Sequence, residues 1–330
     1  MHRGFIVTVA LVLSALIVAC GGGGGGSVAG GGIGGTGITS GTVTGFGSVF
    51  VNGIEFETDG ASRDVDDEID ISNGFDDDTV LGIGMVVTIT GTVNADGVTG
   101  RADRIEYDDE VEGPVTDEQD DGDPNTRTFS IFNVSVVIDR TTTVFASTDY
   151  GDLAENDLLE VSGYFDEDGK LLATRVEGKD KLVLGVSEVE IKGEVSSFDS
   201  NSSTFELLGL DGIVITFDNA TVFEDLPDTV ANGQFVEVKG TLFDDSIFAS
   251  RIELEEEGFG DDVDEISLEG IVTDFIDISN FRVSGQRVNA SSAAFDPSSL
   301  KTSLADGDRV EVEGALVDGI LKARELESED

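Results

Sequence analysis

This sequence contains almost no imidazole or thiol groups, which are common general bases, activated nucleophiles and soft metal ligands. The single histidine, His2, and the single cysteine, Cys20, both lie close to the N-terminus. The rest of the chain therefore excludes intramolecular disulfides, zinc sites built from histidine and cysteine, Ser-His-Asp triads and Cys-His dyads. Carboxylates dominate what remains, with 68 Asp and Glu against 19 Lys and Arg and a formal net charge of −49.

The acidic segment at residues 117–123 could bind a hard cation. Its sequence, Asp-Glu-Gln-Asp-Asp-Gly-Asp, offers alternate oxygen ligands and then a glycine, and it resembles the start of an EF-hand loop. The twelfth position would be Thr128 instead of glutamate, and no helices are expected on either side. Asp117, Asp121 and Asp123 are therefore calcium candidates. The alternative is that the acidic runs are solvated loops and that the protein needs no cofactor.

The N-terminus has the pattern of a secretion signal. Arg3 precedes an apolar stretch at residues 5–19, which suits a signal peptide and is short for a bilayer span. Residues 17–20 read Ile-Val-Ala-Cys and resemble the lipobox of bacterial lipoproteins. The resemblance implies cleavage after residue 19, attachment of acyl chains such as palmitate to Cys20 and, because Gly21 follows, an outer-membrane location. The alternative is an ordinary secretory signal with a chance cysteine.

A glycine-rich segment follows the cysteine. Residues 21–26 are all glycine, and Gly, Ser and Thr dominate as far as residue 39. Such a composition cannot bury a core, so we expect residues 20–39 to form a flexible tether.

Beyond residue 40 the chain contains four copies of one unit. Each copy opens with Gly-x-Val followed by Thr or Ser, at residues 41–44, 113–116, 193–196 and 270–273. Each then reaches a second glycine inside an alternating apolar segment, at Gly91, Gly163, Gly240 and Gly314. An arginine lies near the end of each copy, and we expect these arginines to pair with nearby acids: Arg104, Arg175, Arg251 and Arg324.

Alternation with a period of two predicts strands with one buried face. Units of this size bury a core most readily by curling into a small barrel, and the second glycine suits a sharp bend. We expect a type I′ hairpin at residues 51–54 and core positions at Met85, Val236, Val238 and most phenylalanines. The alternative for the phenylalanines is a stacking surface for glycan. The apolar segment 179–184 could form an additional strand between the second and third units.

These features define an all-β chain of four tandem small OB-like β-barrels after a lipoprotein signal and a Gly-rich tether. The expected boundaries are 1–19 for the signal, 20–39 for the lipidated cysteine and tether, and 40–109, 110–180, 188–257 and 266–328 for the repeats. Each barrel alone would be marginally stable. The copies either pack together or hang as beads, and on the bead picture a damaged third unit would leave the first one folded.

The repeats resemble a family of bacterial lipoproteins with tandem small OB-like β domains of uncharacterised function, the domain of unknown function 5666 family. The residues that carry the resemblance are Gly-Thr-Val-Thr-Gly-Phe-Gly-Ser-Val-Phe-Val-Asn-Gly at 41–53 and the Val-x-Val-x-Gly segments. The resemblance implies an architecture and an envelope location but no established activity.

The charge balance restricts the function. Nucleic acids and anionic lipid surfaces are bound through cations, so a net charge of −49 argues against both. A glycosidase needs two placed carboxylates and a cleft with sugar-stacking aromatics, and the chain has no Trp and three Tyr. Near-identical small barrels also offer no single large pocket.

We therefore expect a non-enzymatic envelope lipoprotein, held in the membrane by a lipid on Cys20. Its barrels would serve binding, adhesion or structure, with an envelope protein or a glycan as partner. The alternatives are a calcium-dependent binder of surface glycan or matrix and, more distantly, a carboxylate-based hydrolase.

Overall fold

The computed structural model describes residues 36–65, 68–70, 80–119, 122–179, 181–210, 212–226, 229–255, 258–259 and 262–329. The predicted signal peptide, Cys20 and most of the tether lie outside these residues. Among the described residues, no helix has the length and apolar character needed to cross a membrane.

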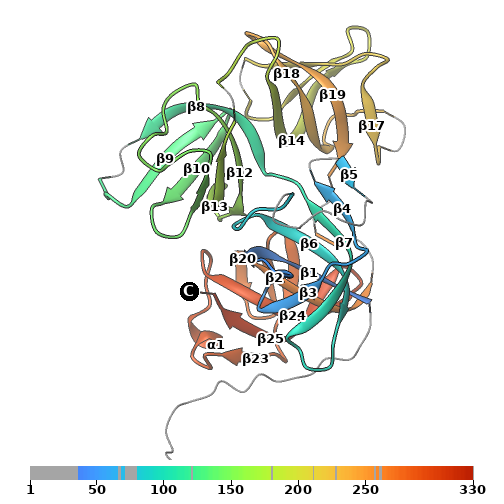
Figure 1. Cartoon of the computed structure of the whole chain (residues 1–330). Helices are drawn as coiled ribbons and strands as arrows, with labels where there is room; N and C mark the ends of the chain where they lie inside the picture. The colour runs from blue at the N-terminus through green and yellow to red at the C-terminus, as the bar shows by residue number, and fades with distance from the viewer. Residues whose placement is uncertain are drawn as a thin grey trace, which may run out of the picture.

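The described residues form two large sheets, one of 13 strands and one of 12. Repeats 1 and 4 make the first sheet, and repeats 2 and 3 make the second (Figure 1). Repeat 1 contains β1 (Thr36–Gly45), β2 (Val49–Val51), β3 (Ile54–Glu57), β4 (Ser62–Val65), β5 (Glu68–Asp70), β6 (Val86–Val93) and β7 (Thr99–Tyr107). Repeat 2 contains β8 (Val111–Gln119), β9 (Thr126–Ile131), β10 (Val134–Asp139), β11 (Val144–Ala146), β12 (Leu158–Phe165) and β13 (Lys170–Gly178).

The last two repeats have the same element order. Repeat 3 contains β14 (Glu188–Asp199), β15 (Thr204–Leu207), β16 (Val214–Thr216), β17 (Val222–Glu224), β18 (Phe235–Leu242) and β19 (Ser246–Leu254). Repeat 4 contains β20 (Val263–Asp277), β21 (Asn280–Val283), β22 (Gln286–Asn289), β23 (Ala294–Asp296), the one-turn helix α1 (Leu300–Ser303), β24 (Arg309–Val317) and β25 (Ile320–Ser328).

Each repeat closes into a barrel of five strands. In repeat 1, β1 pairs with β2, β2 with β3, β3 with β7, β7 with β6, and β6 returns to β1. Repeat 3 closes in the same order through β14, β15, β16, β19 and β18. The predicted small barrels are thus confirmed, and so is the hairpin at residues 51–54, where Asn52 and Gly53 have φ of 51° and 69°.

The second glycine of each repeat lies where two backbones touch. In all four hairpins the strand register shifts immediately before this glycine. A Cβ atom there would lie 2.2–2.4 Å from a carbonyl oxygen of the partner strand. A side chain cannot fit at this distance, which explains why all four copies have glycine at the bend.

Each barrel has its own apolar core. Met85, Val236 and Val238 are buried as predicted. The prediction for the phenylalanines is confirmed at Phe129, Phe205 and Phe281 but is wrong at Phe223, which is 40% exposed. Phe223 lies on the short strand β17, which pairs with the barrel only through β19 in the described residues.

Strand pairing joins the repeats in two pairs, and hydrogen bonds join the two pairs to each other. In the first sheet β1 runs parallel to β20, with Ile38 opposite Ile266. In the second sheet β8 pairs with β14. The two sheets meet where the Thr174 hydroxyl donates to the carbonyl oxygen of Gly84 at 2.6 Å. The bead alternative is therefore wrong.

Two predictions about connecting segments also need correction. Residues 36–39, expected in the flexible tether, belong to β1, and Gly37 allows close contact because a Cβ would lie 2.8 Å from the Glu265 carbonyl oxygen. The segment 179–184 forms no strand in its described residues. The amide groups of Val186 and Ser187 instead donate to the Val183 carbonyl oxygen and close a local turn.

Candidate functional site

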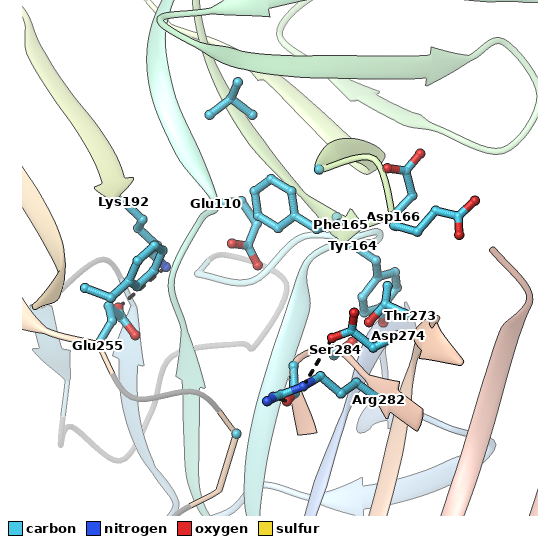
Figure 2. A pocket seen from close by; sticks show the side chains of 17 residues that line it. Glu110, Tyr164, Phe165, Asp166, Lys192, Glu255, Thr273, Asp274, Arg282 and Ser284 are labelled. Carbon is cyan, nitrogen blue, oxygen red and sulfur yellow. Dashed lines mark hydrogen bonds and ion pairs between the residues drawn. The ribbon is translucent and has the colours of Figure 1, made fainter. Parts of the chain in front are cut away.

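A cleft of about 620 Å³ lies where repeats 2, 3 and 4 meet. Figure 2 shows Lys192 and Glu255 on one side, Tyr164, Phe165 and Asp166 on the other, and Asp274 and Arg282 along the lower edge. We expected that similar small barrels would offer no single large pocket. The expectation concerned single barrels, whereas this cleft is formed by the packing of three repeats.

Repeat 2 contributes the end of β12 to this cleft, and there it differs from the other copies. The two residues after the second glycine are Tyr164 and Phe165, whereas the other repeats have Thr92-Val93, Thr241-Leu242 and Ala315-Leu316. Leu242 and Leu316 are buried in their barrels, but Phe165 is 39% exposed and lines the cleft. Repeat 2 therefore exposes an aromatic ring at a position that repeats 3 and 4 bury in their cores.

Tyr164 fixes repeat 2 against repeats 1 and 4. Its buried hydroxyl donates to Glu269 Oε2 at 3.0 Å and lies 3.0 Å from the Thr42 hydroxyl. The Arg309 guanidinium lies over the ring, 5.4 Å from its centroid. Burial, and then the Glu269 carboxylate, raises the pKa of Tyr164 well above its usual value, so the hydroxyl keeps its proton.

Glu269 is the centre of this three-repeat contact. Its Oε2 atom also accepts a hydrogen bond from the backbone N–H of Thr42 at 2.8 Å, and its Oε1 atom pairs with Arg309. A buried carboxylate is stable only when its oxygens are satisfied, as they are here. The position of the Phe165 edge of the cleft therefore depends on the contact between Tyr164 and Glu269.

Repeat 3 contributes Lys192, Phe235 and Glu255 to the cleft. Phe235 is 47% exposed, and the Lys192 ammonium lies 3.8 Å from Glu255 and 3.2 Å from Glu237. Burial opposes the charge of Lys192, but the surrounding carboxylates, Glu110 and Glu237 foremost, raise its pKa well above the usual value. Lys192 is therefore held charged and already neutralised by acids.

Repeat 4 supplies a hairpin turn and a second ion pair. Ser284 and Gly285 have φ of 45° and 76° and join β21 to β22, in a turn like that at residues 52–53. The Arg282 Nε atom lies 3.5 Å from Asp274. Both cations that line the cleft, Lys192 and Arg282, thus have carboxylate partners.

The cleft carries an excess of acid. Five lining residues are acidic and two are basic: Glu110, Asp166, Glu167, Glu255 and Asp274 against Lys192 and Arg282. Burial, and then Asp306 of repeat 4, raises the pKa of Glu167, so carboxylates of two repeats approach one another at this rim. Burial also raises the pKa of Glu110. Exposed phenyl rings beside acidic groups can bind an organic ligand that presents positive charge.

A second cleft of about 500 Å³ lies between repeats 1 and 4 and is also acidic. Glu311 on β24 lies opposite Glu269 on β20 and Glu327 on β25, and like charges in this position destabilise a sheet. Burial raises the pKa of Glu311 to about 8. The residue before the opening glycine is Lys192 in repeat 3 but Glu269 in repeat 4, and Arg309 is the cation that pairs with Glu269 on this face.

Other carboxylates gather where repeats 1 and 2 join. Ligand atoms of Asp109, Glu112 and Glu160 lie within 4.8 Å of one another. The Tyr107 hydroxyl donates to Glu160 Oε1 at 2.7 Å, and Lys179 forms an ion pair with Glu160. The hydrogen bond from Tyr107 and the ion pair with Lys179 thus partly compensate the negative charge of this cluster.

The predicted calcium loop is described only in part. Asp117 lies in β8 with φ of 47°, and both Asp117 and Asp123 are exposed. Asp123 Oδ1 accepts the backbone N–H of Asn125 at 2.9 Å. Asp121 lies outside the described residues, so calcium binding at this loop stays a prediction.

The four arginines near the repeat ends pair with acids, as predicted. Arg104 contacts Asp64 at 2.8 Å and Glu106 at 2.9 Å, and Arg175 contacts Glu177 at 2.6 Å. The remaining two pairs are Arg251 with Glu224 and Arg324 with Glu265. These arginines support the barrel walls.

Sequence reasoning missed the cleft residues Phe165, Lys192 and Phe235. The available signal was the departure of one copy from the others, since Tyr164-Phe165 replaces a small residue followed by an aliphatic one. The sequence alone does not show that these two residues face a cleft, because that depends on how the repeats pack.

The barrels and the cleft together define a class of protein: an acidic tandem-repeat β protein with a candidate binding site at the junction of its repeats. The sequence pattern described as Domain of unknown function (DUF5666) matches residues 38–106, 112–177, 192–253 and 269–327. The chain belongs to this family, as the resemblance noted above implied. A comparison with curated proteins gave no match.

Proposed function

We propose that this protein is a lipid-anchored protein of the bacterial outer membrane whose four barrels form a non-catalytic binding module. Its binding site is the cleft between repeats 2, 3 and 4. The observation that carries the proposal is Phe165, which is 39% exposed in the cleft although the same position is buried in repeats 3 and 4. Exposing an apolar ring in a concave site is unfavourable for folding and is typical of a surface that is covered by a ligand.

The chemistry of the lining favours binding over catalysis. Histidine and cysteine occur only at His2 and Cys20, so the cleft has neither an imidazole base nor a thiolate. Its two cations, Lys192 and Arg282, are engaged by Glu255 and Asp274. These groups orient a ligand well but offer no activated nucleophile.

The anchoring part of the proposal rests on residues 17–20 and on the position of β1. Residues 20–35 separate the expected lipid from Thr36, where β1 begins. A glycine-rich tether of this length has a root-mean-square reach of about 22 Å. The barrels would therefore lie just beyond the lipid headgroups.

The binding role can be tested with a fluorescent reporter because the chain has no tryptophan. Phe165→Trp places the sole indole in the cleft, and Phe243→Trp is the matched control, since Phe243 is 44% exposed and does not line the cleft. We expect fractions of a cell-envelope extract to shift the emission of Phe165→Trp and to leave that of Phe243→Trp unchanged. Silence of Phe165→Trp with every fraction would contradict the proposal.

Anchoring is tested separately with Cys20→Ser. We expect this variant to lose lipid labelling and membrane retention while the barrels keep their melting temperature. If the intact mass of the protein from the native host shows an uncleaved, unmodified N-terminus, the lipid anchor is refuted. That result would have no bearing on the proposed binding site.

A further inference from the structure

The lining of the three-repeat cleft also indicates a ligand class, an inference that rests on the proposed function. We propose that the cleft binds a linear aliphatic polyamine. Ammonium groups would pair with the carboxylates, and the methylene segments between them would lie on the rings of Phe165 and Phe235. The lining residues thus include partners for the ammonium groups and for the methylene segments of such a ligand.

The phenyl rings supply the first half of the argument. Phe165 and Phe235 come from different repeats, and they are 39% and 47% exposed. A ring face attracts a cation within about 6 Å and at the same time contacts apolar methylene groups. An inorganic cation would leave the apolar surface of these rings unused.

The carboxylates supply the second half. The lining has five acids against two bases, and both bases already pair with acids. At the repeat 2 rim, the adjacent acids Asp166 and Glu167 both line the cleft, so a positive group bound beside them would relieve repulsion. The net charge of −49 also concentrates cations near the protein and repels anionic ligands.

The size and shape of the cleft favour a small multivalent ligand. Its volume of about 620 Å³ is typical of a small-molecule site. Acidic groups line the cleft from all three repeats, with Asp166 and Glu255 on opposite sides (Figure 2), and Glu255 and Asp274 are shared with Lys192 and Arg282, so one ammonium group cannot reach them all. A chain that alternates ammonium groups with short methylene segments can.

The test is titration of the unlipidated chain from Gly21 onward with spermidine, followed by calorimetry and by the emission of Phe165→Trp. Magnesium chloride at matched ionic strength supplies charge without methylene groups. An N-acetylated tripeptide with one lysine supplies a single alkylammonium group, and maltotriose supplies an uncharged ligand. We expect saturable binding of spermidine, with the other three ligands at least about tenfold weaker.

Two pairs of variants locate the site. Phe165→Ala should weaken spermidine binding about tenfold, whereas Phe243→Ala, at an exposed ring outside the cleft, should have no effect. Glu167→Gln should weaken binding several-fold, and its control is Asp245→Asn, an exposed acid of the corresponding turn in repeat 3. If Phe165→Ala does not fold, Phe235→Ala tests the same point on the opposite side of the cleft.

Each result decides between outcomes. Equal spermidine binding by the Phe165 and Phe243 alanine variants would mean diffuse counter-ion binding and would overturn the proposal. An equal response to magnesium, the tripeptide or maltotriose would also overturn it. If envelope fractions shift Phe165→Trp but spermidine does not, the ligand class is wrong and the proposed binding function stands. If neither shifts it, both proposals fail.

Discussion

Tyr164→Phe should loosen the contact that holds repeats 1, 2 and 4 together. The change removes one hydroxyl, which donates to Glu269 Oε2 at 3.0 Å and lies 3.0 Å from the Thr42 hydroxyl. A hydrogen bond to a charged acceptor contributes about 1.5–3 kcal/mol. Because Glu269 keeps its contacts with Arg309 and with the Thr42 amide, we expect a loss near the middle of that range.

The assay combines thermal unfolding with hydrogen exchange. A loss of about 2 kcal/mol should lower the melting temperature by about 4 °C in a protein of this size. Exchange should accelerate in β20 and β1, where repeats 1 and 4 pair, and in the end of β12 that contains Phe165. Spermidine affinity should fall as well because the Phe165 side of the cleft is no longer fixed.

Tyr107→Phe is the matched control. Tyr107 is also buried and donates to a carboxylate, Glu160 Oε1 at 2.7 Å, but that contact joins repeats 1 and 2 without repeat 4. The Tyr107→Phe variant should lose a similar free energy of unfolding and should leave hydrogen exchange in β20 unchanged. The reasoning is refuted if Tyr164→Phe leaves β20 exchange unaltered, or if both variants accelerate it equally.

Three further predictions concern other parts of the fold. Gly240→Ala should cost about 2–4 kcal/mol in urea unfolding, since its Cβ would lie 2.4 Å from a backbone oxygen, whereas Gly151→Ala, with open space around it, should be neutral. The folded-state pKa of Glu311 is raised to about 8, so wild-type stability should fall as the pH rises from about 4.5 to 8. Glu311→Gln should remove part of that fall. If the melting temperature of Glu311→Gln minus that of the wild type does not increase between pH 4.5 and 8, the prediction is wrong. Calcium should raise the melting temperature more than sodium at equal ionic strength, and changing Asp117, Asp121 and Asp123 to asparagine should abolish the excess; equal shifts of the melting temperature in the two salts would mean that the loop is only solvated.

Local rules were enough to predict the repeat unit. Alternation such as Val236-x-Val238 shows which strand face is buried, and Asn52-Gly53 specifies a tight hairpin regardless of the rest of the chain. Gly240 was recognised as a bend because a glycine inside a strand has few other uses. These features depend on contacts within one unit.

The arrangement of the units depends on information that no single unit contains. Residues 36–39 look like tether by composition, yet they form a strand that pairs with β6 of repeat 1 on one side and with β20 of repeat 4 on the other. Tyr164 looks like an ordinary strand residue until Glu269, 105 residues later, accepts its hydrogen bond. The cleft follows from such long-range contacts, so the sequence alone could not locate it.

Small-angle X-ray scattering of the chain from Gly21 onward tests most directly whether the four barrels form one body, on which the cleft depends. A single body of about 290 residues has a radius of gyration of about 20 Å, whereas four separate barrels in a row give about 30 Å. We predict a value near 20 Å, with a small increase from the glycine-rich segment, that does not change with salt. A value near 30 Å would contradict the packing of the repeats and, with it, the binding cleft.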